Sequence, residues 1–432
     1  MDETHVVTCF LRNRGEVLLL KRSEAVGSYS GLWGGVAGHA EGAPDEAARE
    51  EVAEETGLLS ACELARKGVA FEFTDSEAGT ASKSRESPGD EDLGVRWVVS
   101  PYLFDCEDRN VETNRETTEF EWVHPTEMLR RETVPNLWAA YSRVAPTIEA
   151  VAEDSDHGSA YVSVRALEVL RDRAGSFAVR ETGDWSALAA IAERLLDARP
   201  SMAAVGNRVN RAMADSSDEQ TPAAVERAAR EGIERAFRAD EEAAENAADE
   251  IRDATVLTLS RSGTVLNALD SASRVFVAES RPAREGVGVA EELASLENGP
   301  DATLHTDAAV AHVLATEDVD AVVVGADAVL PDGRVVNKTG TRGAALAAPR
   351  EGVAVYAVAA TDKVRTDDAV HLEEGDSGEV YEGEADVSVL SPTFDVTPSE
   401  CVSGVITERG VLDAEGISAV VAELKELSEW CR

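Results

Sequence analysis

The pattern of hydrophobic and polar positions changes twice along the chain, and each change predicts a different kind of structure. The first part holds short, β-rich apolar runs at residues 4–11, 15–21, 69–73 and 95–104. A helix is predicted from Pro44 to Thr56, because proline suits a first helical turn and Gly57 suits the residue after the last. Strands followed by a helix and further strands predict an α+β domain with a mixed sheet, which we place at residues 1–144.

Strand signals disappear between residues 145 and 251, where alanine-rich amphipathic segments predict a helical subdomain. One helix is expected over residues 185–200, and a longer one begins at Thr221 and Pro222. Beyond residue 252, short apolar runs alternate with helical segments; the runs are TVLTL, RVFVA, ATLHT, VDAVVVG and GVAVYAV. This rhythm predicts a Rossmann-like α/β domain, with a parallel sheet covered by helices on both faces.

Composition narrows the possible functions. The 432 residues include 83 acidic and 41 basic ones, a net charge of −42 that is spread along the chain. Such a surface suits a halophilic protein, because concentrated salt screens the repulsion, and it argues against direct nucleic-acid binding. No apolar run is long enough to span a membrane and no secretory signal is visible, so we expect a cytoplasmic protein.

Cysteine usage gives a further expectation. The five cysteines are dispersed and include no CxxC pair; they are Cys9, Cys62, Cys106, Cys401 and Cys431. An odd, scattered set argues against a disulfide framework and against a structural zinc site. We therefore expect unpaired thiols.

The predicted helix at Pro44 carries the first candidate chemistry. Glu51, Glu54 and Glu55 are spaced three and four residues apart and share one helical face. Grouped carboxylates repel one another unless a divalent cation neutralises them, and their hard oxygen ligands suit Mg²⁺ or Mn²⁺. Gly35 and Gly38 precede the helix and allow the backbone to approach a phosphate closely. The arrangement predicts metal-assisted attack of water on a diphosphate, although an acidic chain can also carry such a cluster as a solvated face.

The run from Glu51 to Leu58, EVAEETGL, resembles the second half of the Nudix hydrolase motif, R-E-hydrophobic-x-E-E-x-G-hydrophobic. Segments 32–35 and 121–125 resemble the same family, so that the resemblance covers residues 4–144. It implies a Mg²⁺-dependent (or Mn²⁺-dependent) hydrolase of a nucleoside-diphosphate-linked or similar diphosphate substrate. Glu51, Glu54 and Glu55 would then be both catalytic residues and metal ligands.

Two features depart from that motif. The arginine position is occupied by Glu50, and Arg49 lies one place early. The loop from Gly38 is two residues shorter than usual, which leaves Glu41 as the nearest counterpart of the first-half glutamate. These departures keep open an alternative in which the domain only recognises a ligand.

Polar residues follow the predicted parallel strands of the C-terminal part. They are Ser260, Arg261, Arg281, Asp327, Asn337 and Lys338. Because ligands bind at the carboxyl ends of parallel strands, these side chains predict a pocket for a small phosphorylated substrate, such as a sugar phosphate or a nucleotide.

Segments 279–282 (ESRP), 325–327 (GAD) and 337–341 (NKTGT) resemble the initiation factor 2B alpha/beta/delta family. The resemblance spans about 150–432, and this family includes methylthioribose-1-phosphate isomerase and ribose-1,5-bisphosphate isomerase. In the isomerases a cysteine and the aspartate of GAD form an acid/base pair. Asp327 matches the aspartate, but Ser260 stands at the cysteine position, which disfavours isomerase activity. Glu285 stands where the family usually has glutamine.

The second resemblance also implies partners. It leaves open a non-catalytic, regulatory protein of translation initiation, with a translation factor as its partner, and an aldose-ketose isomerase of the ribose-1,5-bisphosphate type. Members of this family commonly self-associate, so we expect a homo-oligomer formed through residues 145–432.

Overall fold

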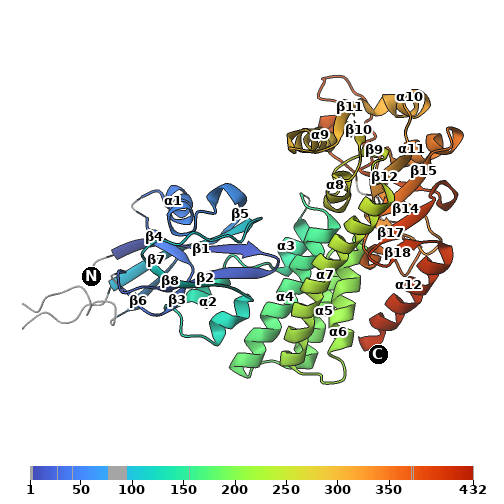
Figure 1. Cartoon of the computed structure of the whole chain (residues 1–432). Coiled ribbons are helices and arrows are strands. Elements are labelled where there is room, and N and C mark those ends of the chain that lie inside the picture. Colours follow the sequence, from blue (N-terminus) through green and yellow to red (C-terminus); the bar gives the residue numbers. More distant parts are fainter. Residues whose placement is uncertain are drawn as a thin grey trace, which may run out of the picture. The chain divides into compact units, whose positions relative to one another are not determined.

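The structure is a computed structural model that describes residues 3–26, 28–40, 42–75, 95–154, 156–370, 372 and 374–431. The chain forms two compact units, which are coloured along the sequence in Figure 1. The first unit contains Met1–Thr147 and Arg171–Asp184, and the second contains Ile148–Leu170 and Trp185–Arg432. Among the described residues, no helix has both the length and the apolar character required to cross a bilayer.

The first unit is built on an eight-stranded mixed sheet with the order β3-β2-β1-β7-β5, to which β4, β6 and β8 are added at the sides of β1, β7 and β2. Its strands are β1 (Glu3–Asn13), β2 (Glu16–Arg22), β3 (Trp33–Gly34), β4 (Val36–His39), β5 (Cys62–Lys67), β6 (Phe71–Asp75), β7 (Val95–Cys106) and β8 (Thr117–Val123). β1 and β2 pair as antiparallel neighbours and form a hairpin, in which Arg14 and Gly15 turn the chain with positive φ angles. The pairing of β1 with β7 is parallel.

Helices cover both faces of this sheet because side chains along β1 alternate between them. Val7, Cys9 and Leu11 point to the face covered by α1 (Pro44–Thr56), in a cluster that includes Ala48 and Val52. Phe10 points the other way, toward α2 (Leu137–Tyr141). Helix α1 begins and ends where the sequence predicts, with a proline in its first turn and Gly57 in the left-handed conformation at its end.

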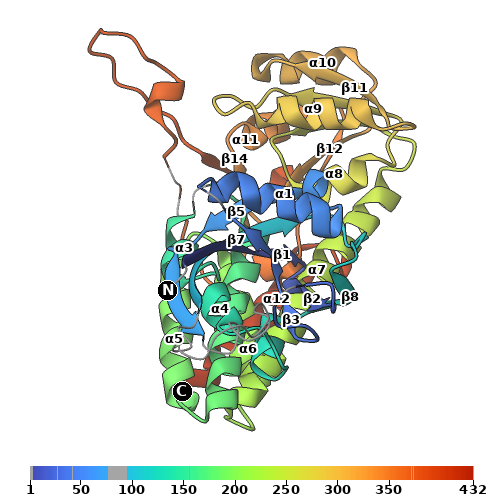
Figure 2. The same cartoon turned by 90° about the vertical axis from the view of Figure 1, so that its left-hand side faces the viewer.

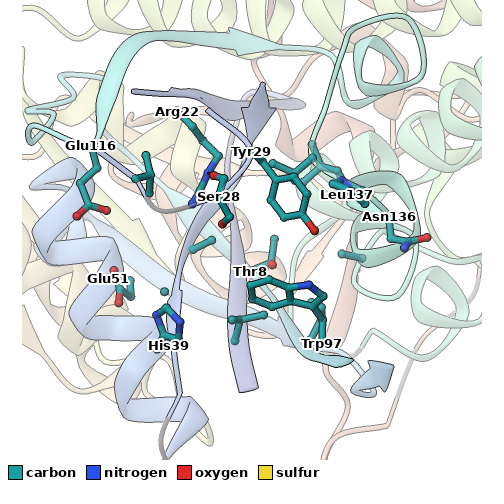
Figure 3. Close-up of a pocket in the computed structure, with 18 of the residues that line it drawn as sticks. Thr8, Arg22, Ser28, Tyr29, His39, Glu51, Trp97, Glu116, Asn136 and Leu137 are labelled. Carbon is teal, nitrogen blue, oxygen red and sulfur yellow. The ribbon is translucent and has the colours of Figure 1, made fainter. Parts of the chain in front are cut away.

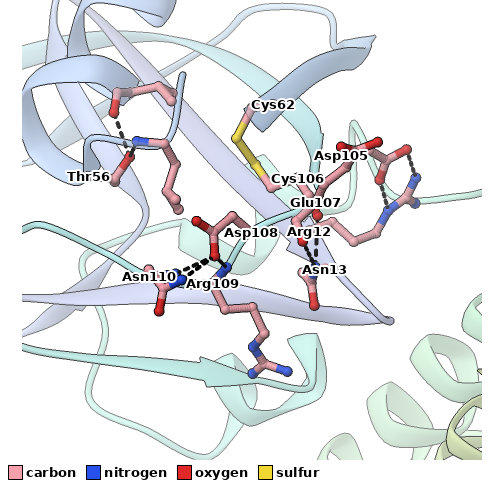
Figure 4. Close-up of a disulfide and its surroundings, with 12 residues drawn as sticks. Arg12, Asn13, Thr56, Cys62, Asp105, Cys106, Glu107, Asp108, Arg109 and Asn110 are labelled. Atoms are coloured by element: carbon pink, nitrogen blue, oxygen red, sulfur yellow. Dashed lines mark hydrogen bonds and ion pairs between the residues drawn. A yellow bond between two sulfur atoms is a disulfide. The ribbon is translucent and has the colours of Figure 1, made fainter. Parts of the chain in front are cut away.

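A disulfide between Cys62 and Cys106 corrects the expectation of unpaired thiols (Figure 4). The two residues lie directly opposite each other on β5 and β7, with Cα atoms 4.1 Å apart. They are 44 residues apart in sequence, so only the pairing of the two strands brings them together. Cys9 and Cys401 are free thiols, as expected.

The second unit contains a seven-stranded sheet with the order β11-β10-β9-β12-β15-β17-β18, in which all neighbours are parallel except β17 and β18. This confirms the predicted parallel sheet. A smaller antiparallel sheet has the order β13-β14-β16. The strands are β9 (Thr255–Leu259), β10 (Arg274–Ala278), β11 (Asp301–His305), β12 (Ala321–Gly325), β13 (Ala328–Val329), β14 (Val335–Lys338), β15 (Ala354–Val358), β16 (Phe394–Thr397), β17 (Gly404–Thr407) and β18 (Gly410–Leu412).

The remaining helices are α3 (Ile148–Glu153), α4 (Ser159–Arg180), α5 (Trp185–Ala198), α6 (Ala203–Asp215), α7 (Pro222–Glu250), α8 (Gly263–Leu269), α9 (Glu285–Ser295), α10 (Val310–Thr316), α11 (Thr341–Ala347) and α12 (Ala414–Leu427). The helical subdomain is predicted over residues 145–251, and most of its helices share a unit with the parallel sheet. The physical reason is a common core: Ala243 and Ala247 of α7 belong to the same apolar cluster as Val256, Val275 and Val323 of the sheet.

A carboxylate on α12 links folding of this unit to pH. Glu423 accepts hydrogen bonds from Arg409 (2.7 Å) and Arg211 (2.9 Å), and these contacts lower its pKa to about 2. A carboxyl whose pKa is lower in the folded state stabilises the fold above its unfolded pKa of about 4.5, and this contribution disappears as the pH falls to about 2. We therefore expect the free energy of unfolding to fall less steeply between these pH values in Glu423→Gln than in the unmodified protein.

Urea unfolding at a series of pH values measures this slope. Glu426→Gln is the matched control, because Glu426 is exposed on the same helix. Identical slopes for Glu423→Gln and the unmodified chain would show that this ion pair does not contribute to acid sensitivity.

Candidate functional site

A cavity of about 370 Å³ in the first unit has two chemically different walls (Figure 3). The carboxylates of Glu51, Glu54 and Glu116 line one part of it. Tyr29 and Trp97 lie on the other side in Figure 3, and Phe71 and Phe73 also line the cavity. The cavity is thus suited to a ligand with one charged end and one apolar or aromatic end.

Gly38 makes room for the carboxylate of Glu51. A Cβ atom at position 38 would lie 1.6 Å from Oε1 of Glu51, so the Glu51 side chain occupies the space that any other residue would fill. Gly38 also lines the cavity, as the sequence predicts. Gly35 does not line it; its added Cβ would lie 2.8 Å from the carbonyl oxygen of Cys9, which shows that this glycine serves the close packing of the backbone.

The three predicted glutamates of α1 have different environments. Glu54 is exposed, Glu51 is half-buried, and Glu55 is buried behind them and does not line the cavity. Oε2 of Glu55 accepts a hydrogen bond from the backbone N–H of Ala37 (3.3 Å). Burial is the main cause that raises the pKa of Glu55 to about 8, and the charge of Glu51 adds to it. The structure therefore brings Glu51 and Glu54 to the cavity and holds Glu55 beneath it.

The residues at this wall fit a divalent cation in chemistry. Burial, followed by the charges of Glu54, Glu116 and Glu50, raises the pKa of Glu51, and a bound cation would relieve this repulsion. Within the part of the chain that the structure describes, however, no three His, Cys, Asp or Glu side chains are already arranged to hold a metal ion. Glu41, the candidate for the first-half glutamate, lies outside the described residues.

The sequence analysis missed several residues of this site, among them Glu116 and Arg22. Glu116 precedes β8 and belongs to a segment without any recognisable motif. Arg22 ends β2, lines the cavity, and donates from Nε to the carbonyl oxygen of Ser28 (3.0 Å). Its positive charge acts on Glu55 and Glu116, whereas Arg49, near the motif's arginine position, is exposed on α1. Strand pairing alone brings these residues together, so spacing along the chain gives no signal for them.

A second cavity, of about 640 Å³, lies in the second unit at the carboxyl ends of β9 and β12. It is lined by five of the six residues predicted for this pocket: Ser260, Arg261, Asp327, Asn337 and Lys338. Arg281 does not line it. The guanidinium of Arg281 donates to the carbonyl oxygen of Glu379, and the backbone N–H of Arg281 donates to the carboxylate of Asp307. Arg281 borders a separate small cavity of about 70 Å³.

Lysine side chains supply positive charge to the second cavity. Nζ of Lys338 lies 2.8 Å from Oε1 of Glu285, the residue that stands at the family's glutamine position. Lys363 is buried and donates from Nζ to the carbonyl oxygen of Ala326 (2.9 Å). Lys363 was missed by the sequence analysis, because its segment is placed by a distant helix: Asn207 of α6 donates to the carbonyl oxygens of Asp362 and Val364.

The two units hold two different cavities, one lined by the carboxylates of Glu51, Glu54 and Glu116 and one at the edge of a Rossmann-like sheet. Comparison with known families agrees with this division. Residues 155–414 match the initiation factor 2 subunit family, and residues 2–144 match the NUDIX domain. The chain belongs to the initiation factor 2 subunit family and carries an N-terminal NUDIX domain.

Curated relatives of the C-terminal part are isomerases. Ribose 1,5-bisphosphate isomerase of Haloferax volcanii is 32% identical over 306 residues, which are 65% of this chain and 94% of that protein. Methylthioribose-1-phosphate isomerase of Pseudomonas syringae pv. tomato is 31% identical over 313 residues, 64% of this chain and 86% of that protein.

Solved structures show the same fold. Translation initiation factor eIF-2B of Pyrococcus horikoshii is 27% identical with a TM-score of 0.51, covering 61% of this chain and 94% of that one. The 5-methylthioribose 1-phosphate isomerase of the same organism has a TM-score of 0.51 at 22% identity, covering 72% and 90%, and supports the fold alone. These comparisons confirm both family resemblances.

Proposed function

We propose that the NUDIX domain hydrolyses the diphosphate bond of a nucleoside-diphosphate-linked substrate, with Mg²⁺ or Mn²⁺ as cofactor. The observation that supports this is the division of the first cavity into a carboxylate wall and an aromatic wall. A base can stack on Tyr29 and Trp97, whose ring centroids are 6.2 Å apart, while the diphosphate lies toward Glu51 and Glu54. A phosphate cannot approach these carboxylates unless a cation balances their charge.

Each side chain of the site has a role in this proposal. Glu51, Glu54 and Glu116 would hold the divalent cation, which neutralises phosphate charge and lowers the pKa of bound water. Arg22 would donate to a phosphate oxygen and offset the charge of the neighbouring glutamates. Glu55, which is buried, does not line the cavity and accepts a hydrogen bond from the backbone of Ala37, would support the position of Glu51.

A panel of nucleoside diphosphate sugars, dinucleoside polyphosphates and nucleoside triphosphates tests this function. We expect release of a nucleoside monophosphate or of phosphate from at least one of them with Mg²⁺, and none with EDTA. Binding of a panel member with no hydrolysis at any Mg²⁺ or Mn²⁺ concentration would favour the alternative, in which the domain only recognises its ligand.

For the second unit we propose binding of a phosphorylated pentose in the 640 Å³ cavity. The contact that decides its strength is the pair between Lys338 and Glu285, because Glu285 competes with the phosphate for the lysine. We expect Glu285→Gln to bind ribose 1,5-bisphosphate about threefold to tenfold more tightly, and Lys338→Ala to bind it about tenfold or more weakly. Isothermal titration calorimetry measures both changes.

Glu291→Gln is the matched control, since Glu291 is exposed on the same helix, α9. Equal affinities for Glu285→Gln and Lys338→Ala would exclude this cavity as the phosphate site.

The isomerase relatives keep an isomerase activity as a second candidate, for which Asp327 would be the acid/base residue. Turnover of ribose 1,5-bisphosphate that disappears in Asp327→Asn would support it; absence of turnover would leave a binding or regulatory domain of translation initiation.

A further inference from the structure

Strand β5 follows the carboxylate-bearing helix α1 after a short 3₁₀ turn, Leu59–Ala61, and few apolar contacts hold this strand in place. It lies at one end of the strand order, and Figure 2 shows it next to β7 and below α1. Four of its six residues are exposed and none is fully buried, and a register shift between Leu64 and Arg66 interrupts its pairing with β7. An edge strand with so little burial belongs to the least stable parts of a domain.

The end of α1 depends on the contacts between this region and the segment that follows β7. The backbone N–H of Glu112 donates to the carbonyl oxygen of Thr56, the last residue of α1 (2.9 Å). The backbone N–H of Glu107 donates to the carbonyl oxygen of Ala61, directly before β5 (2.9 Å). Because Glu54 lies in the last turn of α1, the position of its carboxylate at the cavity depends on how β5 and β7 are joined.

The disulfide between Cys62 and Cys106 joins these two strands covalently at this point. Cys62 is the first residue of β5, and Cys106 is the last residue of β7 (Figure 4). The carbonyl oxygen of Cys106 accepts a hydrogen bond from Nδ2 of Asn13, which ends β1 (2.8 Å). The disulfide therefore ties β5, and with it the end of α1, to the central strands of the sheet.

The two sulfurs differ in their accessibility to thiols. Cys62 is partly exposed, whereas Cys106 is only 5% exposed, so a thiol reagent reaches Cys62 first. The thiolate of a dithiol attacks Sγ of Cys62, the S–S bond breaks, and Cys106 leaves as a thiolate that takes up a proton. The second thiol of the reagent then displaces the sulfur of Cys62, which also takes up a proton, and the reagent becomes a cyclic disulfide. The chain gains two electrons and two protons, and the covalent link between β5 and β7 is lost.

We propose that this disulfide is a redox-sensitive clamp on the carboxylate wall of the first cavity. The wall is that of the proposed hydrolase site, so control of hydrolysis by the clamp rests on the proposed function. After reduction, backbone pairing alone holds β5 to β7, so the last turn of α1 moves more freely and Glu54 binds a cation less well. The middle of the helix stays in place, because Ala48 and Val52 are buried in the core beneath it.

Hydrogen exchange with and without dithiothreitol tests this clamp. We expect the amides of residues 57–64 to exchange about tenfold or more faster after reduction, while those of α2, which covers the other face of the sheet, keep their rates. Oxidised glutathione should restore the slow exchange. Unchanged exchange over residues 57–64 would overturn the proposal, and so would equal acceleration in α2, which would indicate general unfolding.

Two variants separate the disulfide from other effects of the reagent. A chain with both Cys62→Ser and Cys106→Ser should show the faster exchange without dithiothreitol and should not respond to it. Cys401→Ser is the matched control, because it removes a free thiol of the second unit, and it should respond to dithiothreitol as the unmodified chain does. A response in the double variant would assign the effect to another group and overturn the proposal.

Binding of Mn²⁺, measured by electron paramagnetic resonance, connects the clamp to the cavity. We expect reduction to weaken binding by about tenfold, as loss of the groups that support metal ligands commonly does, and the double variant to bind as weakly without reagent. If both redox forms bind Mn²⁺ and hydrolyse a substrate equally, the hydrolase function stands and the clamp is overturned. If reduction weakens Mn²⁺ binding but neither form hydrolyses any substrate, the clamp stands and the hydrolase function fails.

Discussion

Replacing Glu54 by glutamine is expected to reduce kcat for diphosphate hydrolysis by about 100-fold to 1,000-fold. The substitution keeps the size of the side chain but removes one negative charge from the wall formed with Glu51 and Glu116. A neutral amide is a poorer ligand for a hard divalent cation, so both the affinity for Mg²⁺ and the activation of water decrease. Initial rates measured over a range of Mg²⁺ concentrations separate these two effects.

Glu50→Gln provides the matched control, because it makes the same chemical change on the same helix. Glu50 is exposed and does not line the cavity, so we expect its rates to stay within about threefold of the unmodified enzyme. Equal losses in the two variants would mean that bulk charge on α1, rather than the cavity wall, controls the reaction. Full activity in Glu54→Gln would remove this residue from the site.

The parts of this site that could be predicted from sequence lie close together along the chain. Helix α1 is bounded by a proline and a glycine. The spacing of its three glutamates predicts that they share one helical face, so both Gly38 and these acids could be identified from residues 38–57 alone. Glu116, Arg22 and Trp97 come from separate strands and loops, and only the pairing of the strands brings them to the cavity. The disulfide was missed for the same reason, since Cys62 and Cys106 meet through the register of β5 and β7.

The second cavity was easier to predict, because parallel strands place their carboxyl ends at one edge of the sheet. This topological rule places Ser260 and Asp327 at one pocket. Asn337 lines the same pocket but lies on β14 of the antiparallel sheet, so the rule does not account for it. The rule fails for Arg281, because Asp307 accepts hydrogen bonds from the backbone of Ser280 and Arg281 and turns that loop away. Such a side-chain contact between two loops has no signature in sequence spacing.

Gly38→Ala is the second substitution for which we expect a large effect, a decrease in kcat of about tenfold to 100-fold. The new Cβ would lie 1.6 Å from Oε1 and 2.6 Å from Cγ of Glu51. Because the clash is with the far end of a flexible side chain, Glu51 can rotate away at little cost to the fold, but its carboxylate then leaves the cavity wall. Activity should therefore fall while the melting temperature changes little.

Two neighbouring glycines distinguish this effect from general disruption. Gly34→Ala adds a Cβ at 3.6 Å from Val134, an ordinary contact, so both activity and stability should be preserved. Gly35→Ala places a Cβ 2.8 Å from the backbone oxygen of Cys9, which cannot rotate away, so it should lower the free energy of unfolding by about 1–3 kcal/mol. Calorimetric melting and steady-state rates for the three variants measure this contrast.

A double variant decides whether Gly38 acts through Glu51. If the alanine only displaces this carboxylate, then Gly38→Ala combined with Glu51→Gln should be no slower than Glu51→Gln alone, because the group that the alanine disturbs has already been removed. Additive losses would instead show that position 38 contacts the substrate by itself, through its backbone. The outcome thus separates the two roles that a glycine at the entrance of this helix can have: room for a catalytic side chain, or close approach to a phosphate.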